Sequence, residues 1–189
     1  MKKILILITA IALFLAKPGV TYAVNTAGSS ATLESRDMAQ LADFIRKESV
    51  YLKKRAAIKS WLEKNNSPMV GSVDAFIDAC RTYDLDCYLL PAIAGLESTY
   101  GKFIIPGYYN PFGWGGGRIQ FASWEEGIDR VGKGLRNNYI NKGATTVESI
   151  APIYSASQTW APRVRLIMSY LEREEEKNAL YFSSDRVEL

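Results

Sequence analysis

One acidic residue, Glu97, stands at the end of a run of apolar and small residues that begins at Leu89. A helix formed by this run would be buried almost all round, so we expect the carboxyl group of Glu97 to lie against apolar walls. Such surroundings disfavour the charged form of a carboxyl group, and a general acid for glycosidic cleavage must carry a proton. The plain alternative is a glutamate that caps or pairs at a helix end, the commoner role of an isolated glutamate.

Aromatic residues that follow Glu97 extend this pattern. Trp114 lies among glycines in residues 110–117, and Tyr154 and Trp160 come later in the chain. Flat rings with an apolar body and a polar edge are suited to stacking on sugars, so we interpret Trp114 as a sugar platform. Aromatic residues that we expect to fill the core instead are Phe112, Trp124 and Tyr170.

The composition excludes several other kinds of catalysis. The chain contains no histidine, which removes Ser-His-Asp and Cys-His triads and any zinc site with histidine ligands. Its two cysteines cannot form a four-thiolate metal site, and the glycines at 115–117 lack the lysine of a phosphate-binding loop. We therefore expect no metal and no cofactor. Carboxylates, hydroxyls and aromatic rings remain, and this set suffices for glycoside cleavage.

Residues 1–23 have the features of a secretory signal peptide. A basic start precedes a short apolar run, and Thr21 and Ala23 form a small-x-Ala cleavage pattern. The alternative is an uncleaved N-terminal anchor. The signal peptide predicts export to the cell envelope or the exterior. No later segment is apolar enough to span a bilayer, so we expect no membrane span after processing.

Removal of this leader changes the charge balance. Three of the 23 basic residues lie in it (Lys2, Lys3 and Lys17), and the remaining chain carries as many basic residues as its 20 acidic ones. A neutral chain lacks the positive field that nucleic-acid binding requires, so we expect no nucleic-acid partner.

The elements that would position these residues are mostly helical. Residues 24–32 are expected to form a flexible tether, residues 33–67 a helical arm, and residues 178–189 a C-terminal tail. The arm is amphipathic over 33–64, either as one helix or as a broken pair. Further helices are predicted at 73–83, 87–100, 124–138, 147–154 and 163–177. The predicted N-caps are Asp86 for the second of these helices, Ser123 for the third, and Thr145 or Thr146 for the fourth. Pro162 lies near the start of the last helix. The segment 118–121 is the one candidate for a short hairpin edge.

Cys80 and Cys87 flank a break at residues 84–86. On one straight helix, residues seven apart are separated by about 10 Å, which is too far for a disulfide. A corner between two helices would bring them together, and an exported protein with two cysteines favours one bridge. The alternative is two buried, reduced thiols.

Several motifs between residues 69 and 172 resemble those of the lysozyme-like glucosaminidase family (the mannosyl-glycoprotein endo-β-N-acetylglucosaminidase type), which is related to lytic transglycosylases. The similar segments are 91–102 around Glu97, Asn110-Pro-Phe-Gly113, 121–127, and 154–161. This resemblance implies an α-rich lysozyme-like domain over residues 68–177, a peptidoglycan substrate and Glu97 as general acid. It also implies a structural role for Asn110 and Phe112, and a substrate-positioning role for Tyr154.

The candidate site therefore consists of one acid and several substrate-contacting residues. The catalytic candidate is Glu97, and the candidates for contact with peptidoglycan glycan strands are Tyr154, Trp114, Ser98, Tyr100, Asn110 and Trp160. The oligomeric state is left open.

This sequence departs from the family pattern after the Asn-x-Phe-Gly motif. Hydrolytic members carry a longer insert there, a small β-lobe with a second acid, whereas residues 112–123 are short and contain no acid. We therefore expect a reduced or absent β-lobe. The next acids are Glu125, Glu126 and Asp129, which a helix N-terminus favours regardless of function.

Two mechanisms and a second function class remain open. Cleavage by a single acid would give anhydro sugars, and cleavage by an acid pair would give reducing sugars. A glycan-binding or scaffold protein with a lysozyme-like cleft and weak or no turnover is the alternative to an enzyme.

Overall fold

The computed structural model describes residues 27–184, and in this part the backbone is helical with connecting loops. The predicted signal peptide lies outside the described residues, as do residues 24–26 and 185–189. Between residues 27 and 184 there is no strand, so the mainly α fold is confirmed and the segment 118–121 is loop. None of the helices described is long and apolar enough to cross a membrane.

The first helix, α2 (Ala27–Lys64), is continuous, where the sequence left one helix or a broken pair open. It includes residues 27–32, which the sequence assigned to a tether. Once a helix exists, each added residue contributes a hydrogen bond without a new nucleation cost, so a strongly helical segment can extend into a weak neighbour.

The chain divides into two units within α2, Met1–Phe44 and Ile45–Leu189. The last turns of α2 supply three fully buried side chains to the core of the second unit, Ala57, Ile58 and Leu62. This part of α2 therefore belongs to the same unit as residues 68–177, whereas the sequence predicts a separate helical arm over residues 33–67.

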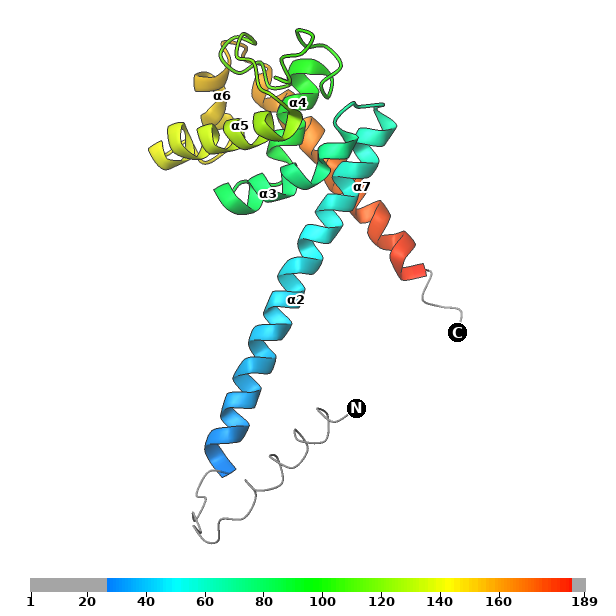
Figure 1. The fold of residues 1–189 in the computed structure, drawn as a ribbon, viewed down its shortest axis with the longest axis vertical. Helices are drawn as coiled ribbons and strands as arrows, with labels where there is room; N and C mark the ends of the chain where they lie inside the picture. The colour runs from blue at the N-terminus through cyan, green and yellow to red at the C-terminus, as the bar shows by residue number, and fades with distance from the viewer. Residues whose placement is uncertain (1–26, 185–189) are drawn as a thin grey trace, which may run out of the picture. The chain divides into compact units, whose positions relative to one another are not determined.

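The other helices all lie in the second unit. They are α3 (Val73–Tyr83), α4 (Leu89–Ser98), α5 (Trp124–Asn138), α6 (Val147–Tyr154) and α7 (Trp160–Ser184), with short 3-10 helices η1 (Val70–Ser72) and η2 (Ile140–Lys142). Helix α3 packs on α5, and α7 packs on both α4 and α6 (Figure 1). The last helix extends beyond Lys177, so residues 178–184 are helical where the sequence predicted a tail.

Helix α4 carries Glu97 and forms the centre of this unit. Its residues from Leu89 to Ala94 are all buried, as the apolar run in the sequence predicts. The helix ends because Thr99 and Tyr100 adopt left-handed backbone conformations, and the amide of Thr99 caps the preceding carbonyls. The carboxyl-terminal turn thus lies at the edge of the core.

The corner before α4 is closed by a disulfide between Cys80 and Cys87, as predicted, with the Cα atoms 4.9 Å apart. Asp84 ends α3 in a left-handed conformation. The Asp86 carboxylate accepts a hydrogen bond from the Tyr88 amide (2.8 Å), one turn before the helix starts. Asp86 therefore stabilises the turn that leads into α4, and is not the N-cap itself.

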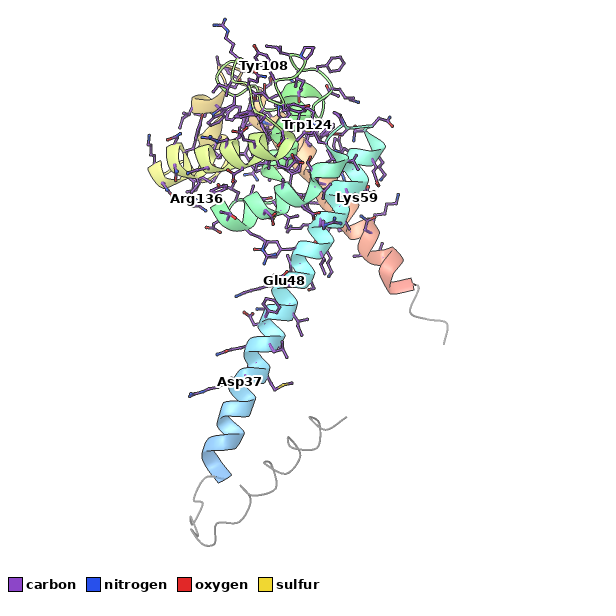
Figure 2. The ribbon with its side chains drawn as sticks, in the orientation of Figure 1. Asp37, Glu48, Lys59, Tyr108, Trp124 and Arg136 are labelled. Atoms are coloured by element: carbon purple, nitrogen blue, oxygen red, sulfur yellow. A yellow bond between two sulfur atoms is a disulfide. The ribbon has the colours of Figure 1, made fainter. Side chains whose placement is uncertain are left out.

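The predicted caps of α5 and α6 are confirmed. The Ser123 hydroxyl accepts a hydrogen bond from the Glu126 amide, and Thr146 forms a reciprocal capping box with Ser149. Between α4 and α5 the chain forms a long loop, on which Figure 2 shows Tyr108, and Trp124 opens α5 at its end. This loop contains the Asn-Pro-Phe-Gly motif.

Polar contacts join α7 to the last turns of α2 inside the second unit. The buried carboxylate of Glu174 accepts hydrogen bonds from Lys64 and from Ser60 (2.7 Å). Burial favours the neutral carboxyl group, but these two bonds outweigh it and lower the pKa of Glu174. Beside them the rings of Trp61 and Tyr170 stack with centroids 5.5 Å apart.

Candidate functional site

Glu97 lies in the last turn of α4, and its side chain is exposed to solvent. The sequence predicts that apolar walls enclose this carboxyl group, and that prediction is wrong. The apolar run covers the first part of α4, while the helix end reaches the surface. An apolar sequence neighbourhood buries the helix but does not decide which way its terminal residue points.

Trp160 holds the carboxylate of Glu97 in place. The indole Nε1 atom of Trp160 donates a hydrogen bond to Oε1 of Glu97 at 2.8 Å, and the Trp160 ring itself is only 3% exposed. The sequence predicts that Trp160 contacts substrate. Because the ring is buried and its one donor is occupied, Trp160 instead positions Glu97 from the first turn of α7.

Asn110 organises the loop that faces Glu97. Its buried side-chain amide donates to the carbonyls of Trp114 (2.9 Å) and Ile119 (3.0 Å), and its Oδ1 atom accepts from the Trp114 amide. These three bonds use most of the hydrogen-bonding capacity of the side-chain amide group. Asn110 therefore has the structural role that the family resemblance implied, and it is not available for direct contact with substrate.

Gly113 brings the loop backbone against the acid. Its φ of +62° lies in the left-handed region, and a Cβ atom at this position would lie 3.3 Å from Oε2 of Glu97. A larger residue would meet both backbone strain and the carboxylate. Glycine at this position thus permits the close approach of the loop to Glu97.

A row of aromatic rings extends from Trp160 through Tyr154 to Trp114. The rings of Tyr154 and Trp160 stack with centroids 4.8 Å apart, and Trp114 lies 5.8 Å from Tyr154. Tyr139 contacts both Trp114 and Tyr154 at 6.1 Å. Tyr139 is not predicted as a site residue, because nothing near it in the sequence distinguishes it from any tyrosine at a helix end.

Three of these rings, those of Trp114, Tyr139 and Tyr154, line a pocket of about 320 Å³. The residues that line it are Gly113, Trp114, Gly115, Gly116, Tyr139 and Tyr154. Gly113 connects this pocket to Glu97, whose Oε2 atom faces that glycine. Trp114 and Tyr154 are thus brought together beside the acid, with the amphipathic surfaces that sugar rings favour.

The Tyr154 hydroxyl donates a hydrogen bond to the carbonyl of Phe112 at 2.7 Å. Burial raises the pKa of the Tyr154 phenol well above its usual value, and the negative charge of Glu97 adds to this effect. Tyr154 therefore stays protonated at any physiological pH. Phe112 is fully buried, as predicted, so this bond ties the wall of the pocket to the core.

Ser98 and Tyr100 do not face the pocket. The buried Ser98 hydroxyl donates to main-chain carbonyls, including that of Pro111 (2.8 Å), and accepts from the Gly101 amide. The buried Tyr100 hydroxyl accepts from Nε1 of Trp61 at 2.7 Å. Both residues were candidates for substrate contact, but their polar groups are enclosed and occupied, so they support the loop from within.

The acids at the start of α5 are held by other partners. Glu125 accepts a hydrogen bond from Ser72, and Asp129 accepts one from Tyr83. Glu126 accepts from the Ala122 amide at 2.7 Å. None of these carboxylates lines the pocket, whereas the carboxylate of Glu97 lies against Gly113, one of the lining residues.

The described residues contain no group of three or more potential ligands that could hold a metal ion.

Neither a scan against protein-family models nor a search of curated proteins finds a match to this chain. The family resemblance therefore rests on the motifs themselves.

Proposed function

We propose that this protein is an exported enzyme that cleaves the glycan strands of peptidoglycan, with Glu97 as its general acid. The observation that carries the proposal is the convergence at one place of Glu97, the indole donor of Trp160 and the pocket of Trp114 and Tyr154. A carboxyl group that can donate a proton, next to aromatic rings on which a sugar can stack, supports cleavage of a glycosidic bond. The motifs shared with lysozyme-like glucosaminidases and the predicted signal peptide support the same substrate and place of action.

In this proposal, the carboxyl group of Glu97 is enclosed only when the substrate is bound. Glu97 is open to water in the free protein. A glycan strand stacked on Trp114 would cover the carboxyl group and exclude water from it, which favours the neutral form that can donate a proton.

The reaction that we propose uses one carboxyl group for both proton transfers. Glu97 donates its proton to the glycosidic oxygen as the bond from that oxygen to C1 of the muramic acid breaks. The C6 hydroxyl of the same sugar attacks C1, and its proton passes to the Glu97 carboxylate, which regenerates the acid. The attack is intramolecular and so benefits from a high effective concentration. The products are a new chain end and a 1,6-anhydro sugar.

The test is the substitution Glu97→Gln in the purified protein without residues 1–23. Glutamine keeps the acceptor oxygen for Trp160 but cannot donate a proton, so we expect peptidoglycan cleavage to fall by at least ~100-fold. Clearing of a peptidoglycan suspension measures the rate, and circular dichroism checks that the variant is folded. Undiminished cleavage by the folded variant would contradict the role of Glu97.

Mass analysis of the wild-type digest tests the single-acid route. Muramic-acid ends lighter by one water support it, whereas exclusively reducing N-acetylglucosamine ends would show hydrolysis with a second group. A wild-type protein that binds the strands without cleaving them would instead support the glycan-binding alternative.

A further inference from the structure

A second pocket, of about 500 Å³, shares Trp114 with the pocket beside Glu97. Its other walls are the loop at residues 119–121 and one face of α5, and we call it the α5 pocket. The α5 residues that line it recur at helical spacing and are Glu126, Arg130, Lys133, Gly134, Asn137 and Asn138. The face is therefore continuous over most of the helix.

Gly134 allows the Trp114 ring to lie directly on this helix. A Cβ atom on Gly134 would lie 2.6 Å from Cζ2 of the Trp114 ring, which is closer than non-bonded atoms approach. The ring thus contacts the helix at the residue next to Lys133. A sugar stacked on Trp114 would have its substituents within reach of the α5 pocket.

The polar groups of the α5 pocket favour an anion. Lys133 is exposed and has no hydrogen bond or ion pair among the described residues, and the amides of Asn137 and Asn138 are also exposed without partners there. The one acid, Glu126, accepts from the Ala122 amide and lies 3.6 Å from the Arg130 guanidinium. Two cations and several amide donors therefore outweigh a single acid that is already engaged.

We propose that the α5 pocket binds a carboxylate substituent of the glycan, with Lys133 as the residue that selects acidic strands over neutral ones. This inference rests on the proposed function, because the glycan on Trp114 brings the carboxylate to the pocket. The lactyl group of muramic acid ends in a free carboxylate on strands that carry no stem peptide, whereas a chitin strand has the same backbone without any acid. Lys133 gives a strongly hydrated point charge, suited to an exposed carboxylate whose position varies.

The experiment measures binding by the Glu97→Gln variant, which we expect not to cleave the glycan, so that the affinities do not depend on turnover. The probes are a peptide-free peptidoglycan tetrasaccharide with free lactyl carboxylates and neutral chitotetraose, compared by calorimetry. We expect Lys133→Glu to lower the ratio of the two affinities, acidic over neutral, by about tenfold. The ratio should also fall as salt rises, because exposed charges are screened. Lys53→Glu is the matched control, since Lys53 is exposed on α2 and lines none of the pockets described.

The outcomes separate the two proposals. A ratio that Lys133→Glu leaves unchanged, or that Lys53→Glu lowers equally, would overturn the role of Lys133 and leave the proposed function intact. Failure of the Glu97→Gln protein to bind either probe would count against the glycan site itself, and the inference would fall with it. Circular dichroism of each variant confirms that a lost affinity is not a lost fold.

Discussion

At the scale of single residues, the position of Glu97 depends on one hydrogen bond from a buried ring. Trp160 is enclosed on all sides, stacks on Tyr154, and has its indole N–H directed at the carboxylate. A donor held this rigidly restricts the rotamers of an otherwise exposed glutamate. The same bond joins the first turn of α7 to the last turn of α4. Trp160 therefore holds in place both the acid and the row of aromatic rings.

We predict that Trp160→Phe lowers peptidoglycan cleavage about tenfold or more, because Glu97 loses its only described donor and samples other rotamers. A hydrogen bond to a charged group contributes about 1.5–3 kcal/mol. Trp61→Phe is the matched control, because it also removes an indole hydrogen bond, the one to the Tyr100 hydroxyl, which lies outside the site. Cleavage rates together with thermal unfolding compare the two, and an equal loss of activity in both would indicate a general effect of stability.

At the scale of elements, α5 supports the ring of Trp114, the side chain that we propose as the sugar platform. Gly132 packs towards Ala79 and Leu90 in the core, whereas Gly134 receives the Trp114 ring. Glycine in a helix interior costs up to about 1 kcal/mol relative to alanine, so its presence at Gly134 calls for a packing reason. The short distance to Trp114 supplies that reason.

We therefore predict that Gly134→Ala displaces the Trp114 ring and lowers kcat/KM for peptidoglycan about tenfold, while the helix itself remains intact. The control is Gly71→Ala, because a Cβ atom on Gly71 meets nothing within 4 Å. Cleavage assays measure the rate, and near-ultraviolet circular dichroism reports the indole surroundings. Unchanged activity with a changed indole signal would show that Trp114 is not the sugar platform.

At the scale of the whole second unit, Glu174 connects its last helix, α7, to the end of α2. Its carboxylate joins α7 to α2 through Lys64 and Ser60. Because the pKa of Glu174 is lowered in the folded protein, the charged form stabilises the fold above the ordinary pKa of 4.5. This contribution is lost as the pH falls through the folded pKa.

We predict that Glu174→Gln lowers the free energy of unfolding by about 1–2 kcal/mol near pH 7, and by less as the pH falls below 4.5. Urea unfolding over a pH series measures the difference between wild type and variant. Glu176→Gln is the control, because Glu176 is exposed on the same helix. A difference that stays constant across the series would mean that the charge of Glu174 does not matter.

Local features of this protein could be predicted from its sequence because they depend on neighbouring residues. Ser123 and Thr146 cap their helices, the chain breaks at Asp84, and the apolar run from Leu89 forms a buried helix. The disulfide between Cys80 and Cys87 also follows from a local corner. Periodicity and capping act over a few residues, and the sequence displays them directly.

The surroundings of the acid were decided only by the tertiary structure. The bond to Glu97 comes from Trp160, 63 residues away, and the platform depends on the contact between Trp114 and Gly134. Asn110 is a loop residue whose buried amide could not be distinguished from an exposed one in the sequence. Sequence patterns identify the types of residue that meet at a site, but which groups touch depends on the packing of helices distant in the chain.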